Sequence, residues 1–194
     1  MKKKKIIMTV GMPFSGKSIA AKEYKEKGWV VIERDKILDE ILAQETFMQE
    51  VINEARKLPE VTREDVFKIQ NKIAIEKLTD EVINKIKEGE EENYFYDGTN
   101  LQKEARRGIA TLDKESFDVE VMLFAVPLEE LKKRAQKVAE SNERGGSFNE
   151  GALKNIERMY NMFEAPELDE GYSKITEIHL PDEVKNEMSH FSLR

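Results

Sequence analysis

The residues at positions 11–18, G-M-P-F-S-G-K-S, have the types and spacing that bind nucleotide phosphates. Glycines let the backbone curl so that consecutive N–H groups face phosphate oxygens, and a following helix adds its positive dipole end. The lysine reaches the β- and γ-phosphates, and the next hydroxyl holds magnesium. A chance glycine-rich turn is the alternative, but an apolar run precedes this motif and a helical pattern follows it. We therefore expect ATP and Mg²⁺ as cofactors. The expected contacts are Gly11, Pro13, Ser15, Gly16, Lys17, Ser18 and Ile19, with Ser18 on the metal.

Two aspartates stand where predicted strands end. Asp35 follows the apolar run 29–32, and Asp97 closes the run 94–97. Ligands of open α/β sheets bind beyond the carboxyl ends of the strands. Asp35 is then either a base that takes or orients the proton of an attacking hydroxyl, or the cap of a helix starting near Lys36. Asp97 is either a magnesium contact or a turn residue in Asp97-Gly98.

Two arginines near the polar stretch 141–147 are candidates for charge neutralisation. Arg134 lies on a predicted helix, and Arg144 precedes a glycine pair in that stretch. A guanidinium donated from a lid neutralises the charge that spreads over a phosphoryl group in transfer. Ordinary surface arginines are the alternative. We expect a small lid over about 132–150. The two histidines, His179 and His190, show no ligand pattern.

Alternating strands and helices must position these residues. Apolar runs predict strands over 4–10, 29–32, 94–97, 119–124 and 175–180. Helical spacing predicts helices over 18–27, 39–58, 62–89, 128–139 and 150–163, the third opened by a capping box at Thr62. The apolar positions from Met159 to Phe163 are interpreted as core. This order predicts an α/β fold in one domain over 1–194, with a parallel sheet of about five strands between helices.

Composition narrows the function classes. The chain has 194 residues, no cysteine and a net charge of −7. The lack of cysteine excludes disulfides, zinc–thiolate sites, iron–sulfur clusters and thiol catalysis. The lysines at 2–5 precede an apolar run too short for a signal sequence, and no stretch is long enough to span a bilayer. We expect a soluble, cytoplasmic protein with no membrane or obligate protein partner. Its acidic balance predicts only local contact with nucleic acid.

Several motifs together resemble the 5′-polynucleotide kinase family. They are 11–18, then E-R-D at 33–35, then D-G-T-N at 97–100 followed by Arg106-Arg107, and finally F-E-A-P…E-G-Y over 163–172. Glu33 stands where that family has asparagine, and Leu38 stands where its phage members have arginine. The resemblance implies a P-loop kinase fold and transfer of the ATP γ-phosphate to a 5′-hydroxyl of DNA or RNA. The implied catalytic residues are Lys17, Asp35, Arg134 and Arg144, and the implied substrate contacts are Arg34, Asp35, Thr99, Asn100 and Arg107.

Three functions stay open at this point. The first is a polynucleotide 5′-kinase, supported by the motifs and by a set of basic residues that includes Arg106. The second is a kinase of a small hydroxyl-bearing molecule or nucleoside, because P-loop kinases accept many substrates. In that case the helical region 39–89 would shape the acceptor pocket. The third is a nucleotide-dependent switch with little transferase activity. We rank them in that order.

Overall fold

The structure is a computed structural model that describes residues 2–140 and 150–179. The chain divides into two compact units. The first contains the described residues of 1–31 and 91–194, and the second contains residues 32–90. Each unit is described by itself.

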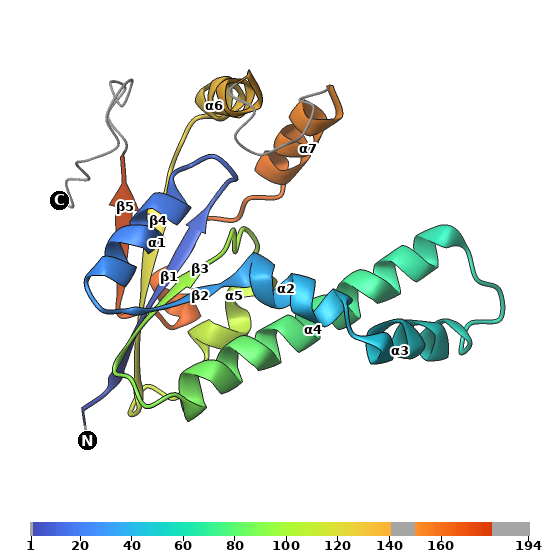
Figure 1. The fold of residues 1–194 in the computed structure, drawn as a ribbon, viewed down its shortest axis with the longest axis horizontal. Helices are drawn as coiled ribbons and strands as arrows, with labels where there is room; N and C mark the ends of the chain where they lie inside the picture. The colour runs from blue at the N-terminus through green and yellow to red at the C-terminus, as the bar shows by residue number, and fades with distance from the viewer. Residues whose placement is uncertain (1, 141–149, 180–194) are drawn as a thin grey trace. The chain divides into compact units, whose positions relative to one another are not determined.

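A five-stranded parallel sheet forms the frame of the fold (Figure 1). The strands are β1 (Lys4–Gly11), β2 (Val30–Glu33), β3 (Asn93–Asp97), β4 (Phe117–Phe124) and β5 (Lys174–Ile178), in the spatial order β2-β3-β1-β4-β5. Central β1 pairs with β3 from Lys5–Asn93 onward and with β4 from Lys4–Phe117 onward. Burial on both sides explains the uninterrupted apolar run of β1, which is typical of a central parallel strand. The predicted α/β fold class is confirmed.

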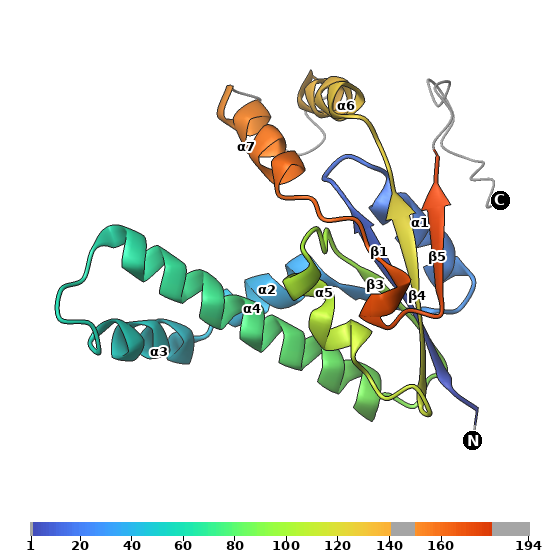
Figure 2. The ribbon, with the colours of Figure 1, turned by 180° about the vertical axis from the view of Figure 1, so that it is seen from behind.

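Helices of the first unit cover both faces of this sheet. Helix α1 (Lys17–Glu26) packs on one face, and α5 (Lys103–Ala110) lies on the opposite face (Figures 1 and 2). Between α1 and the sheet, buried apolar side chains from four strands form one core cluster. Its members are Ile7, Ala20, Ala21, Phe95, Met122, Phe124 and Ile178. This packing fixes the start of α1, and therefore the end of the loop that precedes it.

Two further helices of the first unit follow β4. They are α6 (Leu128–Glu140) and α7 (Glu150–Asn161), followed by a short 3₁₀ helix, η1 (Leu168–Glu170). Ile156 of α7 is buried with Leu131 and Ala135 of α6. Tyr160, Met162 and Phe163 are partly exposed instead. The interpretation of 159–163 as core holds for Met159, which packs against the same cluster as Ile156, and is wrong for Tyr160, Met162 and Phe163.

The second unit is helical and contains α2 (Arg34–Leu42), α3 (Glu45–Ala55) and α4 (Arg63–Glu88). The single helix predicted over 39–58 is interrupted at Gln44, whose backbone is extended. In one straight helix Ile41 and Phe47 would lie about 120° apart around the axis. The interruption lets both side chains be buried.

The long helix α4 begins as its sequence predicts. The Thr62 hydroxyl accepts the Asp65 N–H at 3.1 Å, and Asp65 accepts the Thr62 N–H at 3.0 Å. The predicted capping box is confirmed. The Thr62 hydroxyl also donates to the Asp65 carboxylate, and this bond together with the one from the Thr62 N–H lowers the pKa of the Asp65 carboxyl.

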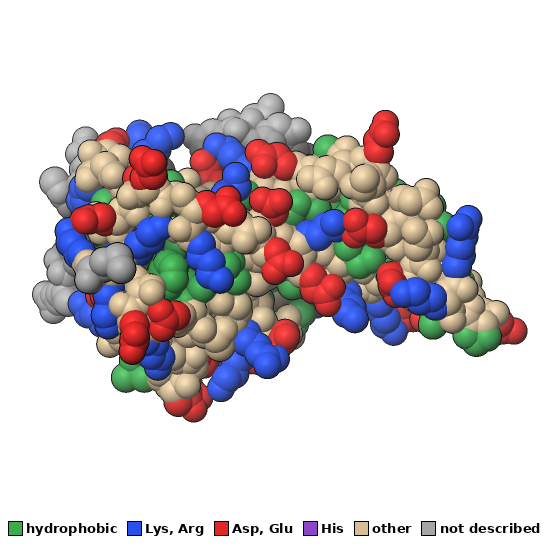
Figure 3. Space-filling view, turned by 90° about the horizontal axis from the view of Figure 1, so that it is seen from below, with side chains coloured by type: hydrophobic (Ala, Val, Ile, Leu, Met, Phe, Trp, Pro, Cys, Tyr) green, Lys and Arg blue, Asp and Glu red, His purple; other side chains and the backbone are tan. Residues whose placement is uncertain are grey.

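Charge is mixed on the face of the molecule that Figure 3 draws. On the face in Figure 3, lysines and arginines alternate with carboxylates over the described residues. Within the described part of the chain, no helix has the length and apolar character to cross a membrane.

Candidate phosphate-binding site

The loop between β1 and α1 has the backbone shape of an anion-binding turn. Phe14 and Gly16 have positive φ angles of 66° and 101°. Residues in this left-handed conformation turn successive N–H groups toward one side of the chain, which makes a concavity for anions. Glycine takes this conformation without steric cost, which explains its place at position 16. The N-terminus of α1 follows directly, and its dipole favours negative charge there.

The ammonium group of Lys17 lies across this loop. Lys17 is only 8% exposed, and its Nζ donates to the Met12 carbonyl at 2.6 Å and to the Ser15 hydroxyl at 3.4 Å. A positive charge is thus held inside a turn whose backbone already favours anions. The residues present fit the phosphates of ATP.

Ser18 is exposed in the first turn of α1, where its hydroxyl is accessible to a metal ion. Among the described residues, no group of three or more His, Asp or Glu side chains is arranged to hold a metal. Mg²⁺ commonly keeps several waters and takes few protein ligands besides substrate phosphates. One hydroxyl beside bound phosphates fits that chemistry. Asp97, at the end of β3, is half-buried.

Two apolar side chains of the phosphate loop pack against residues outside the loop. Met12 is buried, and Phe14 is partly buried, in a cluster with Leu101 and with residues of α6 and α7. The variable positions of the motif are therefore occupied by side chains that pack. This contact joins the phosphate loop to α6 and α7, and most of α6 falls within the lid segment predicted over 132–150.

The segment that follows β3 supports the base of the loop. The Gly11 N–H donates to the Thr99 carbonyl at 3.0 Å, and the Asn100 amide donates to the Thr9 carbonyl at 2.8 Å. The Thr9 hydroxyl donates to the Gly98 carbonyl at 2.8 Å and accepts the Gly98 N–H at 3.0 Å. Thr99 is half-buried, whereas Asn100 is 2% exposed with a φ of 46°. The D-G-T-N sequence thus forms structural contacts with β1.

Arg106 differs from its expected place among surface basic residues. It is fully buried, and its guanidinium makes a two-point ion pair with Glu170, at 3.0 Å and 2.8 Å. Burial opposes the charged form of Glu170, but Arg106 and the Glu167 N–H outweigh it and lower its pKa. Burial also raises the pKa of the Tyr172 hydroxyl, which donates to Glu170. The sequence offered one signal for this pair, because Arg106 and the E-G-Y segment both belong to the motifs quoted above.

Two of the other predicted arginines lie on described helices of the first unit. Arg107, next to Arg106 on α5, is 71% exposed and lies 3.7 Å from Glu104. Arg134 on α6 donates to Glu130 at 2.8 Å. Arg144 lies outside the described residues, as does His190. Both described arginines therefore pair with a carboxylate one turn away on the same helix.

Arg34 and Asp35 belong to the first turn of α2, in the second unit. The residue that caps this helix is Glu33, so the alternative reading of Asp35 as the cap is wrong. The Asp35 side chain is 89% exposed, and Arg34 donates to it at 3.2 Å. An exposed carboxylate held beside a guanidinium is available to an incoming hydroxyl.

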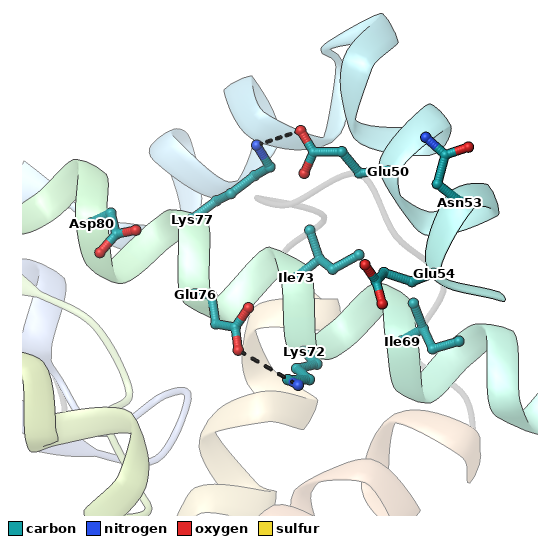
Figure 4. Close-up of a pocket in the computed structure, with 9 residues that line it drawn as sticks. All are labelled: Glu50, Asn53, Glu54, Ile69, Lys72, Ile73, Glu76, Lys77 and Asp80. Carbon is teal, nitrogen blue, oxygen red and sulfur yellow. Dashed lines mark ion pairs between the residues drawn. The ribbon is translucent and has the colours of Figure 1, made fainter. Parts of the chain in front are cut away.

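The second unit also contains a groove between α3 and α4, with a volume of about 550 Å³ (Figure 4). Two ion pairs lie along it, Lys77–Glu50 at 2.9 Å and Lys72–Glu76 at 3.9 Å. Its lining contains more carboxylates than lysines: Glu50, Asn53, Glu54, Ile69, Lys72, Ile73, Glu76, Lys77 and Asp80. The helical region in which an acceptor pocket was expected for a small-molecule kinase therefore contains a polar groove.

Comparison with solved structures identifies the fold. A fungal RNA kinase has a TM-score of 0.56 at 13% identity, covering 97% of this chain and 80% of that one. A sugar kinase from Janibacter sp. HTCC2649 has a TM-score of 0.51 at 19% identity, covering 90% and 85%. The match to a chain of the Pnkp1/Rnl/Hen1 RNA repair complex has a TM-score of 0.49 at 20% identity, and covers 84% of this chain. This chain spans 47% of that longer chain. The likenesses to the fungal RNA kinase and to the sugar kinase agree with the P-loop kinase fold, which is confirmed.

Sequence comparison gives the family. No protein with a curated description matches the chain. Residues 6–166, which include the phosphate loop, Asp35 and Arg106, match the family described as AAA domain, AAA_33. That match covers most of the chain, and the chain therefore belongs to this AAA domain family of P-loop proteins.

Proposed function

We propose that the protein is an ATP-dependent kinase that transfers the γ-phosphate to the 5′-hydroxyl end of DNA or RNA. The observation that carries the proposal is the loop at 11–18, in which the Lys17 ammonium lies inside an anion-binding turn. The kinase fold supports the enzyme class. The motifs shared with 5′-polynucleotide kinases support the acceptor, and a fungal RNA kinase is among the proteins of similar fold.

In the proposed reaction the acceptor hydroxyl attacks the γ-phosphorus in line with the leaving oxygen of ADP. A bond forms from the acceptor oxygen to phosphorus, the bond to the β-phosphate oxygen breaks, and Asp35 takes the hydroxyl proton. Lys17 neutralises the charge on the β- and γ-phosphates, with Arg134 and Arg144 as further donors. Ser18 and Asp97 are the residues that would hold magnesium, which would supply additional positive charge at the phosphates.

The proposed substrate contacts differ in accessibility. Arg107 is the most exposed of those on the first unit and suits a phosphate of the acceptor strand. Arg34 lies beside Asp35, and we propose that it contacts the 5′ end of the acceptor strand next to the hydroxyl that Asp35 deprotonates. Thr99 is half-buried at the edge of the phosphate loop. Asn100 is buried, and we propose that it contributes through its bond to Thr9.

A small-molecule hydroxyl is the second candidate acceptor. The α3–α4 groove favours it, because a polar lining with an excess of carboxylates suits a hydroxyl-rich or cationic molecule better than a chain of phosphates. A sugar kinase also shares the fold. Thermal stabilisation by a sugar or nucleoside, lost when Lys77 and Asp80 are replaced by alanine, would favour this acceptor over an oligonucleotide.

Separate roles for Lys17 and Asp35 test the proposed mechanism. Lys17→Ala should weaken ATP binding, whereas Asp35→Ala should bind ATP as the wild type does and lose transfer by roughly 100-fold or more. Asp39→Ala, an exposed aspartate on the same helix, is the matched control and should keep full activity. Calorimetry measures binding, and transfer is measured with labelled ATP. Loss of ATP affinity in Asp35→Ala would contradict its role as base.

A further inference from the structure

We propose that Arg106 is a positioning residue of the phosphate loop, which transmits the position of the C-terminal segment 164–172 to Gly11 and Met12. The inference rests on the proposed function, because it assumes that this loop binds ATP. It assigns a role to a buried residue that takes no part in the proposed chemistry. All the residues concerned belong to the first unit.

One end of the guanidinium is held by the C-terminal segment. Nε and Nη2 donate to the two carboxylate oxygens of Glu170, whose side chain is 3% exposed. That carboxylate is itself fixed by the Tyr172 hydroxyl and the Glu167 N–H, each at 3.0 Å. Burial by itself would lower the pKa of the Arg106 guanidinium. The hydrogen bond and the charge of Glu170 outweigh burial, so the net pKa is raised and Arg106 stays charged.

The other end of the guanidinium collects backbone carbonyls from two segments. Nη1 donates to the carbonyls of Asn100 and Leu101, each at 3.1 Å, and to that of Glu164 at 2.9 Å. The same two segments are joined again where the Glu164 N–H donates to the Leu101 carbonyl at 2.9 Å. Arg106 therefore ties the chain after β3 to the chain that leaves α7.

The chain after β3 in turn contacts the end of β1 and the phosphate loop through three consecutive residues. The Thr99 carbonyl accepts the Gly11 N–H, and the Asn100 amide bonds the Thr9 carbonyl. The Leu101 side chain packs in the cluster that contains Met12. A displacement of 99–101 would therefore move both the entry to the loop and its apolar anchor.

An ion pair that serves stability alone would not need this arrangement. Buried pairs often contribute little net stability compared with apolar side chains of the same volume. The planar guanidinium differs from a lysine in presenting several donors in a fixed fork. Here the fork serves a carboxylate on one side and carbonyls on the other. Lysine keeps the charge and one contact but cannot span both sides, so Arg106→Lys separates the charge from the geometry.

The test compares Arg106→Lys with Arg158→Lys, at an exposed arginine on α7 of the same unit. Calorimetry measures the Kd for ATP at a temperature where each variant is fully folded. Hydrogen exchange is followed in peptides that contain Gly11 and in peptides from β4. Loss of one carbonyl contact predicts a Kd about tenfold higher for Arg106→Lys. Exchange should accelerate at Gly11 and stay unchanged in β4, whereas Arg158→Lys should match the wild type in both the Kd for ATP and the exchange rates.

The remaining outcomes separate failure of the Arg106 inference from failure of the proposed ATP-binding function. Equal acceleration in β4 and at Gly11, with an unchanged Kd, would show that Arg106 acts on global stability alone and would overturn the inference. If Arg106→Lys does not fold, Glu170→Gln, which loosens the other end of the fork, must show the same selective loss or the inference fails. A wild type that does not bind ATP would overturn the proposed function, and the inference with it.

Discussion

Replacing Asn100 with alanine or with glycine separates two roles for a residue that motif resemblance places at the substrate. The side chain is 2% exposed, and its amide donates to the Thr9 carbonyl at 2.8 Å. The backbone at Asn100 is left-handed, with a φ of 46°. Asparagine tolerates this conformation, glycine accepts it freely, and alanine does not.

The two substitutions share one cost and differ in another. Both remove the hydrogen bond to a buried carbonyl, which costs about 1–3 kcal/mol. Alanine also carries a strain of about 1 kcal/mol in the left-handed region. We therefore expect Asn100→Ala to lower the free energy of unfolding by about 2–4 kcal/mol, and Asn100→Gly to lower it by about 1 kcal/mol less.

Urea denaturation of both variants, with the slope m required to match the wild type, measures the two free energies. Transfer activity is measured in parallel at a temperature where both variants are folded. Destabilisation by glycine equal to or greater than that by alanine would refute the strain argument. If both variants kept wild-type stability and lost transfer, Asn100 would act on the substrate and the structural role would be wrong.

Two further substitutions test the C-terminal segment. At neutral pH, Glu170→Gln should cost about 3 kcal/mol, because it leaves the buried charge of Arg106 without its partner. The folded pKa of Glu170 is depressed, so its contribution is present above the unfolded value near 4.5 and is lost as the pH falls below that value. In denaturation at a series of pH values the gap between variant and wild type should therefore narrow in acid, and a constant gap would contradict the assigned pair. Gly171→Ala should destabilise by more than Gly28→Ala, which we expect to cost about 1–2 kcal/mol. Both glycines have positive φ, but only at Gly171 would a Cβ lie 2.3 Å from the Ala110 carbonyl oxygen; equal thermal shifts would show that this contact relaxes freely.

Local signals in the sequence were enough to predict the phosphate loop and the starts of its flanking elements. The glycines, the lysine and the flanking apolar run are contiguous in the sequence, so the backbone shape that they determine depends on neighbouring residues only. The capping box at Thr62 was predicted for the same reason. The interruption at Gln44 was not, because no proline or glycine marks it and only the competition to bury Ile41 and Phe47 explains it.

The burial of Arg106 shows what a pattern along the chain does not contain. Its partner Glu170 is far away in sequence, and an arginine is by type a surface residue. Only the fold brings the two together at the edge of α5. The motif resemblance includes both residues without giving a reason, and in this chain they form a buried ion pair. The exposure of Tyr160 and Phe163 is not predicted either. Helical spacing identifies an apolar stripe, but it does not show how far along the stripe other elements pack against it.

The central claim is phosphate transfer, and one assay tests it most directly. Purified protein is incubated with γ-labelled ATP, Mg²⁺ and matched 5′-hydroxyl DNA and RNA oligonucleotides, with 5′-phosphorylated strands and Asp35→Ala as controls. The proposed function predicts label on the 5′-hydroxyl strands alone, and none with Asp35→Ala. ATP binding without transfer to any strand would contradict the polynucleotide acceptor.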